Sequence, residues 1–163
     1  MRAIDEAGEL QQVMALYRDT AARAGFSLHD DAYYIDCANL MVDDGVIFGA
    51  FYENKLISFL WLVISQTTAF ELYGGMDDKG QQLRANYTLK WHAIRTLRER
   101  GIERYDMNGL LNDGISSFKQ GFSDHETMLV GTYDYPYSIW YNLWNRILPL
   151  GKKLIRFTKP LRK

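Results

Sequence analysis

Cysteine is nearly absent from this sequence of 163 residues, and long apolar runs are lacking as well. The one cysteine, Cys37, cannot form an intramolecular disulfide, so nothing indicates an oxidising compartment. No apolar run follows Met1, which argues against a signal peptide. The longest apolar run, Leu56 to Ile64, is interrupted by Ser58 and is far shorter than the ~20 residues of a membrane span. We therefore expect a cytoplasmic protein.

Patterns typical of nucleophilic triads and metal sites are also missing. The three histidines, His29, His92 and His125, are scattered, and no serine or cysteine nucleophile motif accompanies them, so a His-based triad is not expected. Paired aspartates occur three times without a histidine or glutamate at ligand spacing, and each pair lies beside a turn or a helix start. We predict helix caps and turns, and no metal, at Asp30-Asp31, Asp43-Asp44 and Asp77-Asp78.

Acidic residues are absent after Asp134. Residues 1–134 carry 12 basic and 20 acidic side chains, whereas residues 135–163 carry seven basic and no acidic ones, so their formal charges are −8 and +7. Such an imbalance indicates an anionic partner surface for the tail. The tail also has an aromatic stripe at helical spacing over residues 137–147. We predict a folded domain over residues 1–134 and an aromatic, basic helical tail over residues 135–163.

The first half of the sequence predicts two helices and three strands. Apolar residues at helical spacing indicate an amphipathic helix and then a second helix, which Asp30 or Asp31 can cap. Two β-rich runs follow, separated by Glu53-Asn54, a two-residue hairpin signal. The expected elements are a helix over residues 9–25, a helix from the Asp30-Asp31 cap to Met41, and strands over residues 46–52, 55–64 and 67–73.

The rest of the chain is organised around the segment from Tyr73 to Phe122. An apolar stripe of Tyr87, Trp91, Ile94 and Leu97/Arg98 predicts an amphipathic helix that ends at Gly101. Residues 105–108 indicate a short buried strand that opens into a polar loop, and residues 127–133 indicate one more strand. A strand–helix–strand unit places its two strand ends side by side, where ligands of α/β sheets gather. The residues expected there are Tyr73, Gly74, Gly75, Asn108, Gly109 and Lys119.

Two helices, an antiparallel meander and a strand–helix–strand crossover follow the element order of the Gcn5-related N-acetyltransferase (GNAT) fold, so we predict an α/β, mixed-sheet, GNAT-like domain. An ordered set of motifs adds to this: Gly74-Gly75, Arg84, Asn86-Tyr87, Trp91, Tyr105-Asp106, Gly109, Phe118-Lys119 and Gly121-Phe122. With this set, residues 10–135 resemble the C-terminal half of the FemABX family, the aminoacyl-tRNA-dependent transferases that build peptidoglycan cross-bridges. The resemblance is tightest over residues 73–122.

The resemblance implies a GNAT-like fold and an aminoacyltransferase that takes part in peptidoglycan biosynthesis and so in cell shape. The donor would be aminoacyl-tRNA, and the acceptor would be the amine of a UDP-linked or lipid-linked muramyl pentapeptide. No metal or organic cofactor is implied. Because family members usually carry two such domains in tandem, the chain is expected to work with a second GNAT-like domain, as a homodimer, or as a one-domain relative with another acceptor.

Amide formation needs an oriented acyl carbonyl, a neutral amine and positive charge at the developing oxyanion. The family's Phe-Lys motif assigns that charge to Lys119, with Phe118 as its anchor. From the residues themselves, Asp106 is either a general base, if burial raises its pKa, or a structural aspartate that bonds a loop. Substrate contacts are expected from Gly74, Gly75, Arg84, Asn86, Tyr87, Tyr105 and Asn108, with Arg84 beside a helix start that suits a phosphate or carboxylate.

Two other hypotheses for the function of the domain and three for the contacts of the tail stay open. A coenzyme A-dependent N-acyltransferase holds the pyrophosphate on a loop with two small residues, but the corresponding stretch here, residues 81–87, lacks them. A non-catalytic module that binds precursor or membrane is the other reading. The tail over residues 146–163 fits an interfacial helix peripheral to the inner membrane surface, contacts with the tRNA backbone, or a helix packed on the domain.

Overall fold

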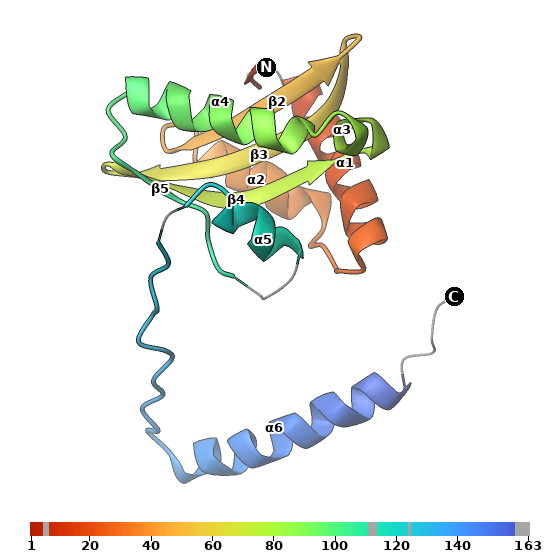
Figure 1. Ribbon diagram of the computed structural model, residues 1–163. Helices are drawn as coiled ribbons and strands as arrows, with labels where there is room; N and C mark the ends of the chain where they lie inside the picture. Colours follow the sequence, from red (N-terminus) through yellow and green to blue (C-terminus); the bar gives the residue numbers. More distant parts are fainter. Residues whose placement is uncertain (5–6, 111–113, 124, 159–163) are drawn as a thin grey trace. The chain divides into compact units, whose positions relative to one another are not determined.

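Alternating apolar residues build a five-stranded sheet in the computed structural model, which describes residues 1–4, 7–110, 114–123 and 125–158 (Figure 1). The strand order is β1-β2-β3-β4-β5, and all neighbours are antiparallel except β4 and β5, which are parallel. Glu53 and Asn54 both have positive φ angles, as a two-residue hairpin between β2 and β3 requires. The strands are β1 (Arg2–Ala3), β2 (Gly45–Tyr52), β3 (Lys55–Ser65), β4 (Thr68–Met76) and β5 (Arg104–Asp106).

Helices cover both faces of this sheet (Figure 1). The crossover helix α4 lies on one face, and α1 and α2 lie on the other. The predicted strand–helix–strand unit is confirmed, since α4 lies between the parallel strands β4 and β5 in the chain. The predicted helix end at Gly101 is also confirmed, and this glycine has a φ of +88°. The helices are α1 (Ala7–Ala24), α2 (Asp31–Leu40), α3 (Asp78–Gln82), α4 (Ala85–Glu99), α5 (Gly114–Gln120) and α6 (Ile139–Thr158).

Two apolar cores lie on opposite faces of the sheet. The core under α4 contains Leu62 and Ala69 from the strands and Leu89 and Leu97 from the helix. The core under α1 and α2 is aromatic, and it contains Tyr17, Tyr34, Phe59 and Trp61. The α4 face is the one that carries the candidate site described below.

The predicted apolar stripe of α4 is correct at Leu97 and wrong at Tyr87 and Trp91. Tyr87 and Trp91 are 47% and 56% exposed. Besides Leu97, the helix buries Ala85, Leu89 and Ala93, together with Lys90. Both sets recur at helical spacing, but the small alanines allow the helix axis to approach the sheet, which two large aromatic rings would prevent.

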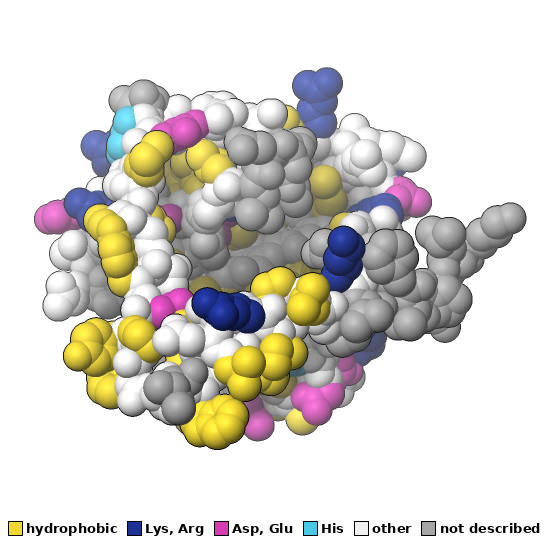
Figure 2. Space-filling model, turned by 90° about the horizontal axis from the view of Figure 1, so that it is seen from below, with side chains coloured by type: hydrophobic (Ala, Val, Ile, Leu, Met, Phe, Trp, Pro, Cys, Tyr) yellow, Lys and Arg dark blue, Asp and Glu magenta, His cyan; other side chains and the backbone are white. Residues whose placement is uncertain are grey.

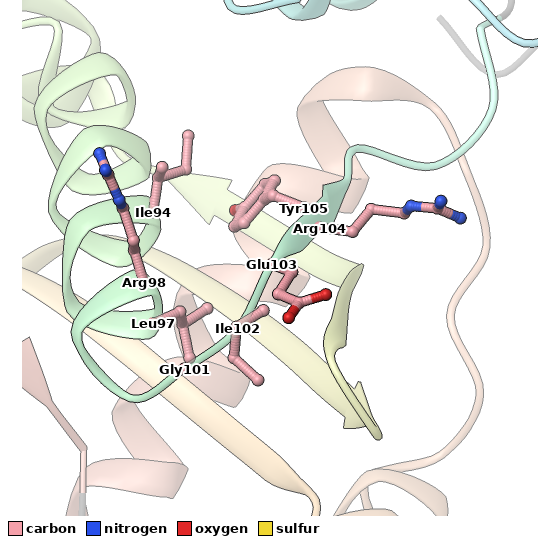
Figure 3. A pocket seen from close by; sticks show the side chains of 8 residues that line it. All are labelled: Ile94, Leu97, Arg98, Gly101, Ile102, Glu103, Arg104 and Tyr105. Carbon is pink, nitrogen blue, oxygen red and sulfur yellow. The ribbon is translucent and has the colours of Figure 1, made fainter.

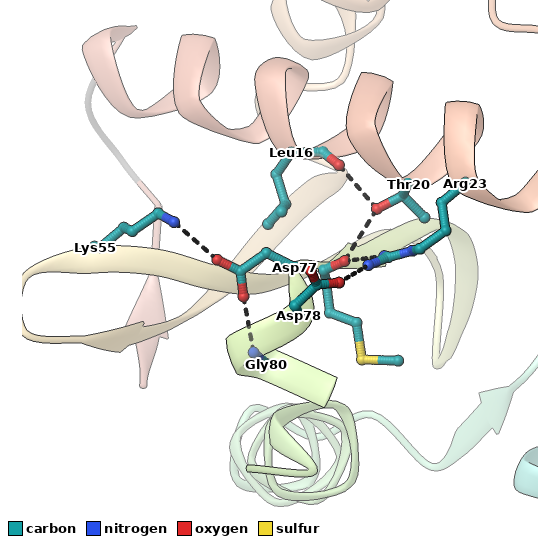
Figure 4. A network of polar contacts seen from close by, with 8 residues as sticks. Leu16, Thr20, Arg23, Lys55, Asp77, Asp78 and Gly80 are labelled. Atoms are coloured by element: carbon teal, nitrogen blue, oxygen red, sulfur yellow. Dashed lines mark hydrogen bonds and ion pairs between the residues drawn. The ribbon is translucent and has the colours of Figure 1, made fainter. Parts of the chain in front are cut away.

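Two of the three aspartate pairs supply helix caps, as predicted. Asp30 caps α2 by accepting a hydrogen bond from the Tyr33 amide. Asp77 caps α3 through the Gly80 amide at 2.8 Å and also binds Lys55 at 3.0 Å (Figure 4). Burial alone would raise the pKa of Asp77, but these hydrogen bonds and the Lys55 charge outweigh it and lower the pKa.

The predicted strand over residues 127–133 is wrong, since the chain has no regular secondary structure there. These residues belong to a second structural unit, Ser123–Lys163, which is distinct from the unit Met1–Phe122. Its helix α6 lies in the part of the chain for which the sequence predicts a helical tail. Within the described ranges, no helix is long and apolar enough to cross a membrane.

The aromatic core makes the fold sensitive to alkaline pH. Burial first, and then the neighbouring Tyr34, raises the pKa of Tyr17 to about 12, and burial also raises the pKa of Tyr73. In the unfolded chain tyrosine ionises near pH ~10, so the unfolded state binds fewer protons above that pH. We expect the free energy of unfolding to fall between pH ~10 and ~12, by at most ~1.4 kcal/mol per pH unit for each such tyrosine. In urea unfolding over this pH range, the free energy of unfolding of Tyr17→Phe should fall less steeply with pH than that of the wild type. An equally steep fall in both proteins would contradict Tyr17 as its origin.

Candidate active site

Strands β4 and β5 pair only over a short stretch, and the candidate site lies where they part, on the face of the sheet that α4 covers. Their parallel pairing spans three residue pairs and ends at Phe70 opposite Asp106, whereas β4 continues to Met76. Just past Phe70, the pairing of β4 with β3 shifts register between Glu71, the partner of Leu62, and Tyr73, the partner of Trp61. Glu71, opposite Leu62, therefore faces α4, and a buried carboxylate stands where the two strands part.

The carboxylate of Glu71 joins three elements. Its Oε1 atom lies 2.7 Å from the Lys90 ammonium on α4 and accepts a hydrogen bond of 2.7 Å from the Tyr105 hydroxyl on β5. Both charged side chains are largely buried: that of Lys90 is 3% exposed and that of Glu71 is 11% exposed. Sequence reasoning did not single out either residue.

Burial and this network shift two pKa values in opposite directions. Burial, opposed by the Glu71 charge and assisted by the Lys119 charge, lowers the pKa of Lys90. Burial followed by the Glu71 charge and hydrogen bond raises the pKa of Tyr105. The Tyr105 hydroxyl therefore stays a proton donor to Glu71, and its role here is to hold that carboxylate.

The predicted Phe-Lys motif lies on helix α5 rather than in a loop. The Phe118 ring meets Tyr87 edge to face at 4.6 Å and Phe122 at 5.4 Å. The Lys90 ammonium lies 4.6 Å from the Phe118 ring centroid and 5.5 Å from that of Phe122. The anchor role expected for Phe118 thus has a physical basis in two aromatic contacts and one cation–π contact.

Lys119 follows this anchor and is half-buried. Its ammonium donates a hydrogen bond, 2.9 Å long, to the Gly109 carbonyl. An ammonium has three donors, so this bond leaves donor capacity for a substrate oxygen. The Lys119 charge also contributes to the lowered pKa of Lys90, which places the two ammonium groups within electrostatic reach of each other.

The turn after β5 is held by its own side chains. Asn108 has a φ of +62°, and its side-chain amide donates to the Glu71 carbonyl at 3.1 Å. Asp106 accepts a hydrogen bond of 2.7 Å from the Asn108 amide and is exposed, so the expectation of a buried strand is wrong at this position. Asp106 therefore has the loop contact of the structural alternative, and it is not buried, which the role of general base was expected to require.

The two glycines lie within β4 rather than after it. Gly75 faces α1, where an added Cβ would lie 2.7 Å from the Thr20 hydroxyl and 2.8 Å from the Phe59 ring. Gly74 is exposed, and a Cβ there would make ordinary contacts of 3.5 Å or more. Gly74 lies opposite Leu60 of the α4-side core, so of the pair it is Gly74 that faces the α4 side of the sheet.

Arg84 and Asn86 mark the start of α4. Arg84 is exposed and has a left-handed backbone at φ +50°, and its side chain does not cap the helix that begins there. Asn86 is half-buried. The same helix presents Tyr87 to the Phe118 ring of α5, so these three predicted residues lie at one end of α4.

An open hollow of about 500 Å³ lies at the other end of α4 (Figure 3). Side chains from α4, β5 and the turn between them line it, and Tyr105 is shared between this hollow and the Glu71 network. Glu71, Lys90 and Lys119 are not among its lining residues, so the hollow is adjacent to the candidate site and separate from it. Its lining consists of Ile94, Leu97, Arg98, Gly101, Ile102, Glu103, Arg104 and Tyr105.

Comparison with known proteins gives both a family and a fold. The model of the FemAB family matches residues 52–147. Solved structures that resemble this chain include the aminoglycoside N-acetyltransferase AAC(6′)-Iy with a bisubstrate analogue (TM-score 0.67, 16% identity, 83% of this chain and 96% of the other). An aminoglycoside acetyltransferase from an uncultured soil metagenomic sample, with sisomicin, also matches (0.60, 17%, 80% and 90%). A third is the PaiA N-acetyltransferase of Thermoplasma acidophilum with coenzyme A (0.53, 17%, 74% and 89%). No curated protein sequence matches. The GNAT-like fold is confirmed.

Proposed function

The chain belongs to the FemAB family, and from that premise we propose that it transfers an amino acid from aminoacyl-tRNA to the amine of a peptidoglycan-precursor stem peptide. Family and fold together support an acyltransferase. The candidate site supports the acyl-transfer step, and the donor and acceptor are proposed from the family. The observation that carries it is the Lys119 ammonium on α5, anchored beside the point where β4 and β5 part.

The reaction needs little beyond positioning and one positive charge. The acceptor amine attacks the ester carbonyl, and a C–N bond forms as the carbonyl oxygen becomes an oxyanion. The C–O bond to the terminal ribose then breaks, the ribose oxygen leaves with a proton, and the amine loses one. Lys119 would stabilise the oxyanion with its remaining donor capacity, and no metal or organic cofactor takes part in this scheme.

Substrate placement is proposed for residues of β4, of the start of α4, and of β5 with the turn after it. Gly74 would leave room for the acyl group, while Gly75 serves the packing of β4 on α1. Arg84, Asn86 and Tyr87 at the start of α4 would contact the tRNA end or the precursor phosphates. Tyr105 and Asn108 would act through Glu71, which both of them contact.

The two glycines give a matched pair for testing this placement. We expect Gly75→Ala to lower the free energy of unfolding by ~1–3 kcal/mol, because its Cβ would meet Thr20 and Phe59. Gly74→Val should leave the urea midpoint close to that of the wild type while it lowers the transfer rate, because it fills the proposed acyl space. Unfolding curves and transfer rates of both variants decide the point. Full activity in Gly74→Val would remove Gly74 from the site.

A coenzyme A-dependent reaction has less support from the same region. Asp77 caps α3 by accepting the Gly80 amide with its own carboxylate, and both Asp77 and Asp78 are already ion-paired, with Lys55 and Arg23. A pyrophosphate at this helix start would compete with the Asp77 carboxylate for a bonded amide, where a phosphate loop offers free amides. The known structures with coenzyme A are similar in fold, and that similarity does not transfer their ligand to this chain.

Helix α6 is proposed to contact an anionic membrane surface. At 100° per residue, its large exposed apolar side chains share one side of the helix, and Arg146, Lys152 and Lys153 lie on the remaining sides. Figure 2 shows hydrophobic side chains next to lysine and arginine side chains on the face in view. The predicted contacts of Lys159, Arg162 and Lys163 lie outside the described residues. The exposed apolar residues are Trp140, Leu143, Trp144, Ile147 and Leu150.

This membrane contact predicts a loss of binding when α6 is altered. Removal of residues 146–163 deletes seven basic side chains, each worth ~1 kcal/mol near an anionic surface, so binding should fall by more than ~10-fold. The measurement is flotation with vesicles of phosphatidylglycerol and phosphatidylethanolamine, and Trp140→Ser with Trp144→Ser in the full chain should act in the same direction. Equal flotation of all variants would end the membrane proposal, and weaker tRNA binding with unchanged flotation would favour a tRNA contact instead.

The function itself is tested by transfer of radiolabelled amino acid from a charged tRNA mixture to UDP-linked and lipid-linked muramyl pentapeptide. Label in the peptide product supports the proposal and identifies the donor. A folded chain without product should be assayed again with a second family domain supplied, because product in that case alone assigns this chain as one half of a two-domain transferase. Protection against thermal unfolding by coenzyme A, together with no transfer from tRNA, would contradict the proposal.

A further inference from the structure

Lys90 is an unusual lysine because α4 turns it toward the sheet. It is 3% exposed, and lysine is rarely buried unless it is paired. Its partner Glu71 comes from β4, and the carboxylate oxygen that binds Lys90 also accepts the hydrogen bond of the Tyr105 hydroxyl on β5. One carboxylate oxygen therefore ties together α4, β4 and β5.

The same ammonium also contacts the segment that contains α5. It lies within cation–π distance of the Phe118 ring on α5 and of the Phe122 ring just after that helix. Helix α5 has seven residues, which is too short for a helix to persist without packing contacts. Its position therefore depends on contacts such as these, and Lys119 follows Phe118 directly in the chain.

The two ammonium groups near α5 differ in how their charge is balanced. Glu71 neutralises Lys90, with which it forms an ion pair of 2.7 Å. Among the described residues, the hydrogen bond of the Lys119 ammonium goes to a neutral carbonyl, that of Gly109. The buried pair thus allows a second cation to stand nearby, where its charge is available to a substrate oxyanion.

We propose that Glu71 and Lys90 are positioning residues for acyl transfer: their ion pair fixes α5, and with it the Lys119 ammonium, at the place where the oxyanion develops. This inference rests on the proposed function. Neither residue needs to touch substrate, because the pair acts through the Phe118 and Phe122 rings. A displacement of Lys119 by about 1 Å is enough to cost ~10²-fold in rate.

The test compares the double variant Glu71→Gln/Lys90→Met with the wild type. The new glutamine side chain can still accept the Tyr105 hydrogen bond, and a methionine at position 90 keeps much of the lysine stem and can pack on both rings, so both charges are removed without an orphaned partner. Arg95→Met on the same helix is the matched control, since Arg95 is exposed and its 3.9 Å pair with Glu99 is solvated. Hydrogen exchange of residues 114–122 and the kcat and KM of transfer are measured on all three proteins.

In the double variant we expect amide exchange in residues 114–122 to rise at least ~10-fold over that in α1, and kcat to fall ~30–100-fold with KM changed less than ~3-fold. The control should match the wild type in both measurements. Unchanged exchange in α5, or a kcat that follows only the folded fraction, would overturn the inference. If the wild-type chain transfers nothing, with or without a second family domain supplied, the proposed reaction fails, and the exchange measurement alone then decides whether the pair holds α5.

Discussion

Replacement of Lys119 by methionine is expected to lower kcat/KM for transfer by ~10²–10³-fold, the usual effect of removing one preorganised oxyanion donor. The ammonium is half-buried and donates to the Gly109 carbonyl on the protein surface, so its loss removes little from the fold. The methionine keeps much of the aliphatic stem. We therefore expect the urea midpoint to stay near that of the wild type while the chemical step slows, which single-turnover kinetics with charged tRNA would measure.

A second lysine provides the control for this substitution. Lys79 lies on α3, where its ammonium stands 4.7 Å from the Tyr52 ring, and it is not part of the candidate site. Lys79→Met removes the same charge from the same domain and should leave kcat/KM within ~3-fold of the wild type. Equal loss in both variants would show that the overall charge of the domain matters, and wild-type activity in Lys119→Met would remove Lys119 from the mechanism.

Local signals were sufficient to predict most of the fold. The hairpin at Glu53-Asn54, the helix ends at Gly25 and Gly101, and the Asp30 cap each require a backbone conformation or hydrogen bond that few residue types supply. These features depend on neighbours in sequence, so a single sequence is enough to reveal them. The strand expected over residues 127–133 had an apolar pattern alone, without a pairing partner that the sequence could identify.

The candidate site was predicted in part, and the reason lies in tertiary pairing. Phe118 and Lys119 were singled out through motif resemblance, and the structure brings Phe118 against Tyr87 of α4. Glu71 and Lys90 were missed, because their pairing joins positions 19 residues apart on different elements. A charged residue inside the apolar strand 68–76 was the available signal, since such a residue is buried at high cost unless it finds a partner.

Removal of Lys90 alone should have the largest effect on stability. Lys90→Met leaves the Glu71 carboxylate, 11% exposed, with the Tyr105 hydroxyl as its remaining side-chain contact in the described structure. Loss of one partner of a buried pair typically costs ~3–5 kcal/mol, because the other charge stays buried without compensation. We expect urea unfolding, followed by tryptophan fluorescence, to show a midpoint lowered accordingly with a similar m-value.

Addition of Glu71→Gln to Lys90→Met should restore most of this loss. The second substitution removes the uncompensated charge, and a neutral buried pair of similar volume is often as stable as the ion pair that it replaces. A double variant as unstable as Lys90→Met would show that the cation–π contacts with Phe118 and Phe122, rather than the charge balance, hold this part of the fold. If the double variant recovers stability but not transfer, the pair has two separable roles. The fold is then stable without the ion pair, whereas the positioning of Lys119 requires it.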